Sequence, residues 1–413
     1  MTVPTINAFI NFSTGPSFAQ AMILDQGILD TNVLADSTAV IVDVSNVINR
    51  IETKRGRSAQ TNQFQTGTMM LTIVDVNGDF NPQNTAGPYY NLLTPMRKVQ
   101  ITATYGSVTY PVFSGFITSF STSIPLAGTS DVAMTTIQTV DAFRLANNAQ
   151  IATVAGTSAG QLSGARINNL LDTISWPASQ RDVDAGLTTV QVDPGTARTA
   201  LAAMQAVETT EFGSLYVDAA GSFVFQDRTV TTTSVAGTAI DFNDDGTGIT
   251  YFNAVWVTND LLVFNQANVT ATGLATQTAS DQPSIDKYFL HSYNAQNLLM
   301  QDTATALNYA RAFVAANAET SVRCDSIELD LYTPDYNAGV IAALDLDYFD
   351  PVTITTKQPG ATVLTKRLQI FGKAMSITPN SWRVVMTTLE PIIDGFILNS
   401  TLYGKLDTGV LSY

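Results

Sequence analysis

The feature that most constrains the fold is a strict alternation of apolar and polar side chains with a period of two residues. In the segment 98–105, Val99 and Ile101 point one way, while Lys98 and Gln100 point the other. Such alternation is typical of half-buried antiparallel strands. The pattern recurs at residues 70–74, 132–140, 222–226, 251–258, 327–331, 363–370 and 382–389. Clusters of Gly, Asn, Asp and Pro separate these segments, so we expect β-barrels or sandwiches.

Helical spacing of apolar residues appears in three places, at residues 167–174, 201–207 and about 302–317. The first helix follows Ser163, a candidate N-cap, and ends before Pro177. Two of the three helices fall between residues 148 and 213. The sequence therefore predicts a mainly β fold with an α+β middle.

Length and charge exclude several classes of protein. A chain of 413 residues exceeds one ordinary core, so we expect about two to four domains. The 20 Lys and Arg against 35 Asp and Glu give a net charge of −15, which repels phosphate backbones and argues against tight nucleic-acid binding. No apolar run reaches the roughly 18 residues of a membrane span, and the start lacks a signal-peptide pattern, so we expect a soluble, cytoplasmic product with no membrane span. Charged residues are only 13% of the chain, as on surfaces covered by other subunits.

The motifs typical of enzymes are incomplete. The segment 156–160 matches the G-x-S-x-G nucleophile elbow, but His291 is the only histidine available as a base and no oxyanion motif is present. We therefore favour a Gly-rich linker over a hydrolase. The single Cys324 excludes an intramolecular disulfide and any multi-thiolate metal site within one chain, and we expect it to be buried in a strand at 322–331.

Asp241, Asn243 and Asp245, followed by Gly246, match the opening of a calcium loop. The match ends there, because Phe252 occupies the position of the bidentate Glu. We favour an acidic turn, keep these three residues as the metal candidates, and expect no cofactor. A second run of alternating side-chain oxygens, at 75–81, carries its glycine too early, and we interpret it as a turn as well.

Positive charge concentrates in one place, at Lys54, Arg55 and Arg57. One interpretation is a solvated loop. The other is a subunit interface, because arginine side chains pair well with the carboxylates of an acidic neighbour. Gly56, between the two arginines, indicates a close backbone approach or a positive φ. We take Lys54, Arg55 and Arg57 as the candidate interface residues.

The basic segment 54–57, the turn 77–82 and the strand 113–116 together resemble the hub proteins at the distal end of bacteriophage tails. In that family an Arg-Gly-Arg stretch, a Gly-Asp/Arg-Phe-x-Pro turn and a Phe-x-Gly strand recur in the first barrel domain. The order of motifs continues along the chain, at residues 166–172, 176–177, 200–213, 223–228, 377–382 and 396–407. The resemblance to the tail-tip or baseplate hub family therefore runs from about Arg55 to Asp407.

This resemblance implies two tube-like antiparallel β-barrel domains, a helix-containing insert domain and a C-terminal extension. The first barrel corresponds to residues 1–147 and the mixed α+β middle domain to 148–230. The second barrel, with one helix at about 302–317, corresponds to 231–392, and the extension to 393–413.

The resemblance also implies a structural virion protein of the phage tail without catalysis, assembled in the bacterial cytoplasm. Three copies would form a homotrimer whose six barrels link the sixfold tail tube, or a distal tail protein ring, to a threefold central spike or fibre. DNA would pass through the ring without specific binding. The alternatives are a hexameric distal tail adaptor and a host-glycan-binding or glycan-cleaving module. Cleavage would need a carboxylate pair, for which the candidates are Glu208 with Glu211 and Asp345 with Asp347.

Overall fold

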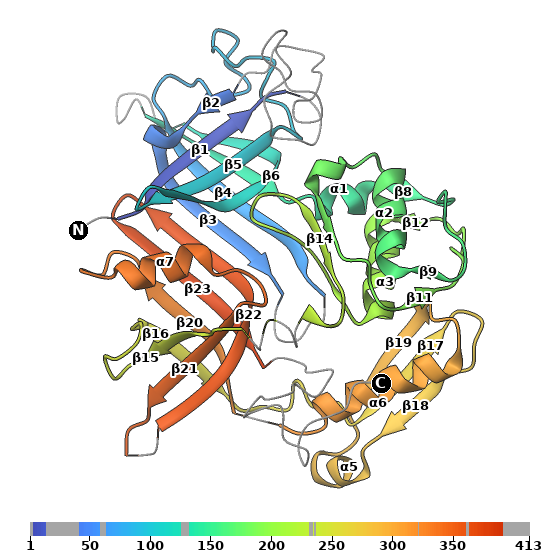
Figure 1. Cartoon of the computed structure of the whole chain (residues 1–413). Coiled ribbons are helices and arrows are strands. Elements are labelled where there is room, and N and C mark those ends of the chain that lie inside the picture. The colour runs from blue at the N-terminus through green and yellow to red at the C-terminus, as the bar shows by residue number, and fades with distance from the viewer. Residues whose placement is uncertain are drawn as a thin grey trace.

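The structure is a computed structural model in which one large sheet spans two regions of the chain (Figure 1). It describes residues 3–13, 41–57, 63–124, 132–230, 234, 237–320, 322–360 and 363–390. The expected C-terminal extension at 393–413 lies outside the described residues. The sheet has 13 strands, all paired antiparallel except β15 with β21. The expected mainly β class with an α+β middle is confirmed.

The first half of the sheet has the strand order β3-β4-β7-β6-β5-β1-β2. Val99 and Ile101 on β5 are fully buried, as their alternation predicts. A short 3-10 helix, η1 (Ser45–Val47), precedes β3. The strands are β1 (Thr5–Asn11), β2 (Ile41–Asp43), β3 (Ile48–Gly56), β4 (Gln65–Asp75), β5 (Lys98–Tyr105), β6 (Val108–Ser123) and β7 (Ala133–Val140).

The second half contributes the path β16-β20-β23-β22, with β21 beside β22 and β15 beside β21. Cys324 is fully buried in β20, as predicted. The helix α7 (Asn337–Asp345) packs its buried residues into the same apolar core as these strands. The strands are β15 (Ile240–Asn243), β16 (Asn253–Val257), β20 (Arg323–Asp330), β21 (Pro351–Lys357), β22 (Val363–Thr378) and β23 (Ser381–Leu389).

The two halves meet where β22 pairs antiparallel with β3, in a register that sets Gly372 opposite Gly56 and Ile377 opposite Ile51. We call this pairing the seam. Gly56 has a φ of +115°, and a Cβ there would lie 2.3 Å from the Cα of Gly372. Both the positive φ and the close backbone approach expected at Gly56 are therefore confirmed. One apolar core runs under both halves, from Leu71 on β4 to Trp382 on β23.

The middle of the chain packs helices against the far end of the sheet. Thr199 caps α3 by accepting a hydrogen bond from the Ala202 backbone N–H at 3.1 Å, and α3 ends at Phe212 with a φ of 62°. The helices are α1 (Phe143–Asn148), α2 (Ser163–Thr173), α3 (Ala200–Glu211) and the 3-10 turn η2 (Ala178–Gln180). The strands are β8 (Gln150–Ile151), β9 (Gln161–Leu162), β10 (Arg181–Val183), β11 (Thr189–Val190), β12 (Arg198–Thr199), β13 (Ser214–Val217) and β14 (Phe223–Gln226). A second core joins α2 and α3 to Phe371 and Leu389 of the large sheet.

A third core lies inside the range expected to form the second barrel. Here α6 (Thr303–Asn317) covers the three-stranded sheet β18-β17-β19, and Phe313 and Ala310 are buried between them. The other elements are α5 (Gln282–Tyr288), β17 (Gln266–Ala271), β18 (Gln277–Ser280) and β19 (Ser292–Leu298). The sequence predicted the helix but not this separate layer, which stands beside α3 in Figure 1. Among the helices in the described ranges, none combines the length and hydropathy needed to cross a lipid bilayer.

Candidate functional site

The basic cluster lies on β3, at the seam of the large sheet. Strand alternation turns Arg55 inwards and Lys54 outwards. Arg55 is only 7% exposed, and its Nη2 lies 3.2 Å from both Oδ1 and Oδ2 of Asp347. Its guanidinium also stands 5.2 Å from the ring centroid of Tyr348. Arg55 thus ties the first half of the sheet to a loop that follows α7 in the second half.

A second cation fixes that loop. Lys373, which pairs with Arg55 across the seam, donates from Nζ to the carbonyls of Leu344 at 3.2 Å and Leu346 at 2.7 Å. The Asp347 backbone N–H donates to Oδ2 of Asp350 at 2.8 Å. Lys373 is 5% exposed, and burial lowers its pKa to about 8. The loop therefore presents Asp347 to Arg55 in a fixed position.

The third basic residue has a different environment. The Arg57 guanidinium lies over Phe371, 4.0 Å from the ring centroid, and 5.5 Å from that of Phe64. Its backbone N–H donates to the Phe371 carbonyl at 2.9 Å. The structure thus separates the three candidate residues, since Arg55 and Arg57 pack within the chain and Lys54 is exposed. Their role at a subunit interface stays a prediction.

A buried carboxylate joins the sheet to the middle of the chain. Asp141, 4% exposed, accepts the backbone N–H of Gly67 on β4 at 2.5 Å and that of Phe143 on α1 at 3.0 Å. Burial raises the pKa of Asp141 to about 7, although both N–H groups favour the charged form. A Cβ on Gly67 would lie 2.8 Å from Oδ2 of Asp141, which explains the glycine.

Glu208 on α3 is a second buried acid in the middle of the chain. It is 2% exposed, and its Oε1 accepts the Leu215 backbone N–H at 2.8 Å. Its Oε2 is buried without a hydrogen-bond partner among the described residues. Burial raises the pKa of Glu208 to about 8, against the opposing effects of the Leu215 N–H and the Arg57 charge. Glu208 therefore makes folding depend on pH.

We expect Glu208→Gln to remove part of the pH dependence of stability. The native carboxyl holds its proton to about pH 8, whereas an unfolded glutamate loses it near pH 4.5. Its stabilising contribution is thus complete below pH 4.5 and is lost as the pH rises to 8. Relative to the wild type, the variant should gain on the order of 1–3 kcal/mol between pH 5 and pH 8. Urea denaturation at both pH values measures this, with Glu52→Gln on β3, a partly exposed glutamate that is ion-paired with Arg50, as the control. A constant difference between variant and wild type would contradict the assignment.

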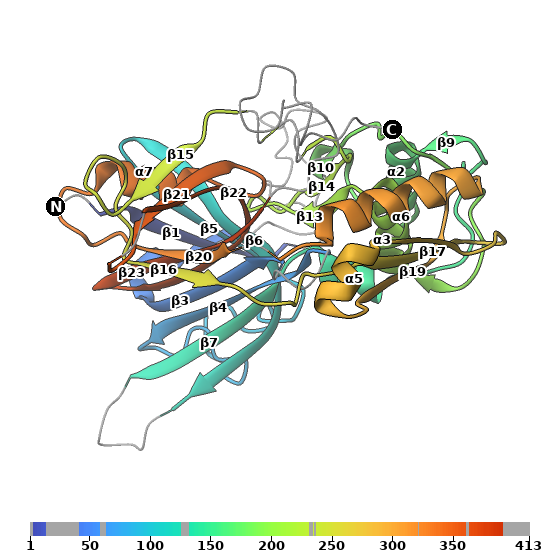
Figure 2. The same cartoon turned by 90° about the horizontal axis from the view of Figure 1, so that it is seen from below.

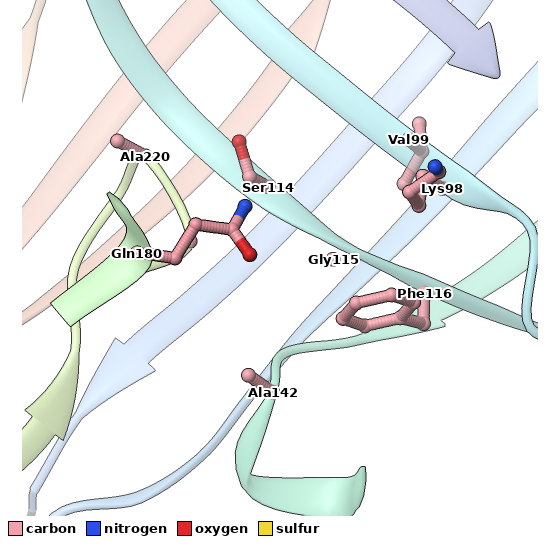
Figure 3. Close-up of a pocket in the computed structure, with 9 residues that line it drawn as sticks. Lys98, Val99, Ser114, Gly115, Phe116, Ala142, Gln180 and Ala220 are labelled. Atoms are coloured by element: carbon pink, nitrogen blue, oxygen red, sulfur yellow. The ribbon is translucent and has the colours of Figure 1, made fainter. Parts of the chain in front are cut away.

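Lys98 is the one residue of β5 whose environment the alternation predicted wrongly. It is 3% exposed instead of facing the polar side, because its Nζ donates to Oγ of Ser13 at 3.0 Å. Burial lowers its pKa to about 8. Figure 3 shows the adjoining cavity, where Gln180 extends towards the strand that carries Ser114. The cavity measures about 20 Å³ and has room for one water molecule beside Oγ of Ser114, which has no hydrogen-bond partner among the described residues.

Of the candidate calcium residues, Asp241 and Asn243 lie at the end of β15 and Asp245 lies in the bend that follows, and hydrogen bonds hold all three. Asn243 is 2% exposed, and its Nδ2 donates to Oδ2 of Asp241 and to Oγ1 of Thr247, each at 3.1 Å. Oδ1 of Asp245 accepts the Thr247 backbone N–H at 2.9 Å. Within the described ranges, no group of three or more His, Cys, Asp or Glu side chains is arranged to hold a metal ion. The preference for an acidic turn over a metal site stays a prediction.

The residues considered for catalysis are held by contacts within the chain. The Ser158 carbonyl accepts from Nη2 of Arg166 at 3.3 Å, and Nε2 of His291 lies 3.0 Å from the carbonyl of Tyr288, the last residue of α5. Glu211 is fully buried and accepts hydrogen bonds from Ser163 and from the backbone of residues 187 and 188. Each of these residues thus makes hydrogen bonds within the chain, Ser158 through its backbone carbonyl.

Solved structures share this architecture. A tail protein from Neisseria meningitidis MC58 superposes with a TM-score of 0.56 at 8% identity, covering 94% of this chain and 97% of that one. The prophage MuSo2 43 kDa tail protein from Shewanella oneidensis gives 0.54 at 11% identity, covering 94% and 99%. The chain has the fold of phage tail proteins. No protein-family model matches the sequence, and no curated protein matches it either.

The shared fold extends over nearly the whole length of both tail proteins, so it includes the large sheet, the helical middle and the α6 layer together. This confirms the fold that the order of motifs from Arg55 onwards implied. At 8% and 11% identity the side chains have diverged almost completely. The residues of the seam must therefore be argued from this chain alone.

Proposed function

We infer that the chain is a structural protein of a phage tail and forms the hub of its tip. Three copies would make a ring that links the sixfold tail tube, or a distal tail protein ring, to a threefold spike or fibre. The observation that carries the proposal is the 13-stranded sheet, with seven strands from residues 5–140 and six from 240–389. Two β units of similar size per chain give six units in a trimer, which matches a sixfold tube.

The edges of the sheet support assembly into a ring. Within the described residues, β16 pairs only with β20 and β2 only with β1, so the two strands stand at opposite ends of the sheet path. Unpaired strand edges are templates for pairing with another chain. An edge at each end allows copies to join head to tail, and such heterologous contacts close into a ring when the rotation fits.

One face of the sheet suits a passage for DNA. On β3, Arg50 forms an ion pair with Glu52. In the second half of the sheet, Arg383 on β23 forms ion pairs with Glu328 at 2.8 Å and Asp330 at 3.3 Å, both on β20. Arg50 and Arg383 are already neutralised by carboxylates, so they bind phosphate weakly. Lys54 is the other cation that β3 places on this face. Between the two arginines lie many uncharged polar side chains, including Thr68, Thr72, Thr136, Gln138, Ser376 and Thr387. Figure 2 shows β3, β4 and β7 fanned out on the side away from the helices of the middle.

The proposal includes no enzymatic activity and no cofactor. It is supported by the structural hydrogen bonds of Ser158, His291 and Glu211, described above. A glycan-binding module would expose aromatic side chains such as those of Tyr348 and Phe349. Here the two residues are buried in the second core, with only 7% and 2% of their surface exposed. The chain would reach its place in the virion through contacts with itself, with the tube and with the spike.

We expect the purified protein to form an assembly with three times the mass of one chain. Native mass spectrometry at micromolar concentration measures this directly, and negative-stain images should show a threefold ring with a central opening. Six copies per particle would favour the hexameric distal tail adaptor instead. A persistent monomer that binds glycans would favour the host-binding module and contradict the hub.

A further inference from the structure

The loop after α5 exposes a phenylalanine in a rare backbone conformation. Phe289 is 84% exposed, and Leu290 beside it is 56% exposed. The backbone of Phe289 has φ 63° and ψ 178°, a region that is almost restricted to glycine. Both the backbone strain and the exposure of the aromatic ring cost stability, and such features are typical of functional or binding sites.

A buried amide holds this loop rigid. Asn265 is fully buried, and its Nδ2 donates to the Phe289 carbonyl at 2.7 Å while its Oδ1 accepts the His291 backbone N–H at 2.8 Å. Nδ2 also donates to Oγ of Ser284 at 3.2 Å. The chain is thus fixed on both sides of Phe289. We call Phe289 and Leu290 the knob. A pre-organised ring loses little conformational freedom on binding.

The same chain carries an apolar pocket of matching size. It measures about 420 Å³ and is lined by the side chains of Met96, Phe116, Leu145, Ala149, Ile174 and Trp176. A cavity of about 150 Å³ already holds benzene, so this pocket accommodates the ring of Phe289 and the branched side chain of Leu290. Its aromatic wall, with Phe116 and Trp176 at 6.4 Å between centroids, favours an incoming ring.

The knob and the pocket cannot meet within one chain. The pocket lies beside α1 and the end of α2, whereas the knob follows α5, and Figure 1 shows α1 at the top of the helical middle and α5 at the bottom of the molecule, with α3 and the α6 layer between them. We propose that the knob of one copy inserts into the pocket of the next copy. The contact is heterologous, and repeated around an axis it orients each copy relative to its neighbour.

This inference rests on the proposed function, because it names the contact that holds the copies of the hub together. It follows from the fit between two surfaces of one chain. A buried aromatic anchor in a pocket is also the residue type that dominates interface energetics.

The first test is Phe289→Gly. Glycine adopts the backbone conformation of Phe289 without strain, so the single chain should be as stable as the wild type or more stable. Loss of the ring should raise the dissociation constant of the assembly at least about tenfold. Val192→Ala, which also truncates a side chain that is 60% exposed, is the control and should change neither property. Analytical ultracentrifugation and thermal melting measure the two effects.

The second test joins knob to pocket covalently. The native Cys324 is fully buried, so it does not compete for oxidation. A chain with Phe289→Cys mixed with a chain with Leu145→Cys should form a disulfide-linked pair under mild oxidation. The same knob variant mixed with Val192→Cys should not.

The outcomes separate the two proposals. A wild-type trimer that Phe289→Gly leaves intact, or cross-linking to Val192→Cys as fast as to Leu145→Cys, overturns the knob contact and leaves the hub standing. A wild-type chain that stays monomeric overturns the hub and the contact together. The melting comparison is made at a dilution where both chains are monomeric, because assembly itself raises the melting temperature. A monomeric Phe289→Gly chain that melts earlier than the monomeric wild type shows that Phe289 stabilises its own fold, which also overturns the contact.

Discussion

Arg55→Ala is expected to lower the free energy of unfolding by about 3 kcal/mol. Breaking a buried ion pair by removing one partner costs about 3–5 kcal/mol, and the lower end applies because Asp347 keeps 36% of its side chain exposed. The cost has two sources. The cavity left by the guanidinium opens beside Tyr348, and Asp347 loses the cation that offsets its carboxylate at the seam.

The matched control for Arg55 is its neighbour Lys54. Lys54→Ala removes a cation of the same sequence cluster on the exposed face of β3, so its effect should stay within about 0.5 kcal/mol. Urea denaturation followed by tryptophan fluorescence compares the two. Asp347→Asn should fall between them, because it leaves Arg55 buried with a weaker acceptor. Equal midpoints for the Arg55 and Lys54 variants would mean that the ion pair contributes nothing to the fold.

This expectation revises the prediction made from the sequence. The sequence indicates Lys54, Arg55 and Arg57 as candidate residues of a subunit interface. Because Arg55 and Arg57 pack inside the chain, their replacement acts first on the chain itself. Of the three candidates, Lys54 alone can be tested for assembly without that complication.

The alternation of apolar and polar residues identified the strands, because a strand with one buried face needs an apolar residue at every second position. β7 and β23, predicted at 132–140 and 382–389, begin and end within a residue of those limits. The same local signal cannot distinguish Arg55 from Lys54. The partner that holds Arg55 inside is Asp347, 292 residues further along the chain.

Two other features of the fold, α7 and the third core, were not predicted from the sequence. Residues 337–345 form α7, but they are short and apolar on nearly every side, so no helical stripe of polar and apolar residues marks them. The third core, around β17 and α6, was hidden because its strands carry the same alternation as those of the large sheet. Sequence predicts that such strands pair, but the choice of sheet depends on long-range packing.

For the candidate site, the sequence predicted the backbone geometry at Gly56 but not the strand that Gly56 approaches. Gly56 indicated a close approach, and the approach exists, against Gly372. The pairing of β3 with β22 was not predictable, because Gly56 and its partner Gly372 lie 316 positions apart in the sequence and no local pattern reports a contact over that distance.

Gly56→Ala is expected to open the seam and to lower the free energy of unfolding by at least about 3 kcal/mol. A positive φ costs an L-residue about 1–2 kcal/mol by itself. The added Cβ would also lie 2.3 Å from the Cα of Gly372 and 2.4 Å from the carbonyl oxygen of Phe371. Both atoms belong to the backbone, so no side-chain rotation relieves the clash, and β22 must move away from β3.

Gly106→Ala separates the two contributions. Gly106 also has a positive φ, +57°, in the turn between β5 and β6, but its Cβ would meet nothing within 4 Å. This control should cost only about 1–2 kcal/mol, the price of the backbone conformation alone. The excess at Gly56 then measures the clash at the seam, and urea denaturation of the two variants gives it by difference. Equal losses would show that β22 and β3 separate without cost, so that the two halves of the sheet fold as independent units. A larger loss at Gly56 means that the seam joins them into one.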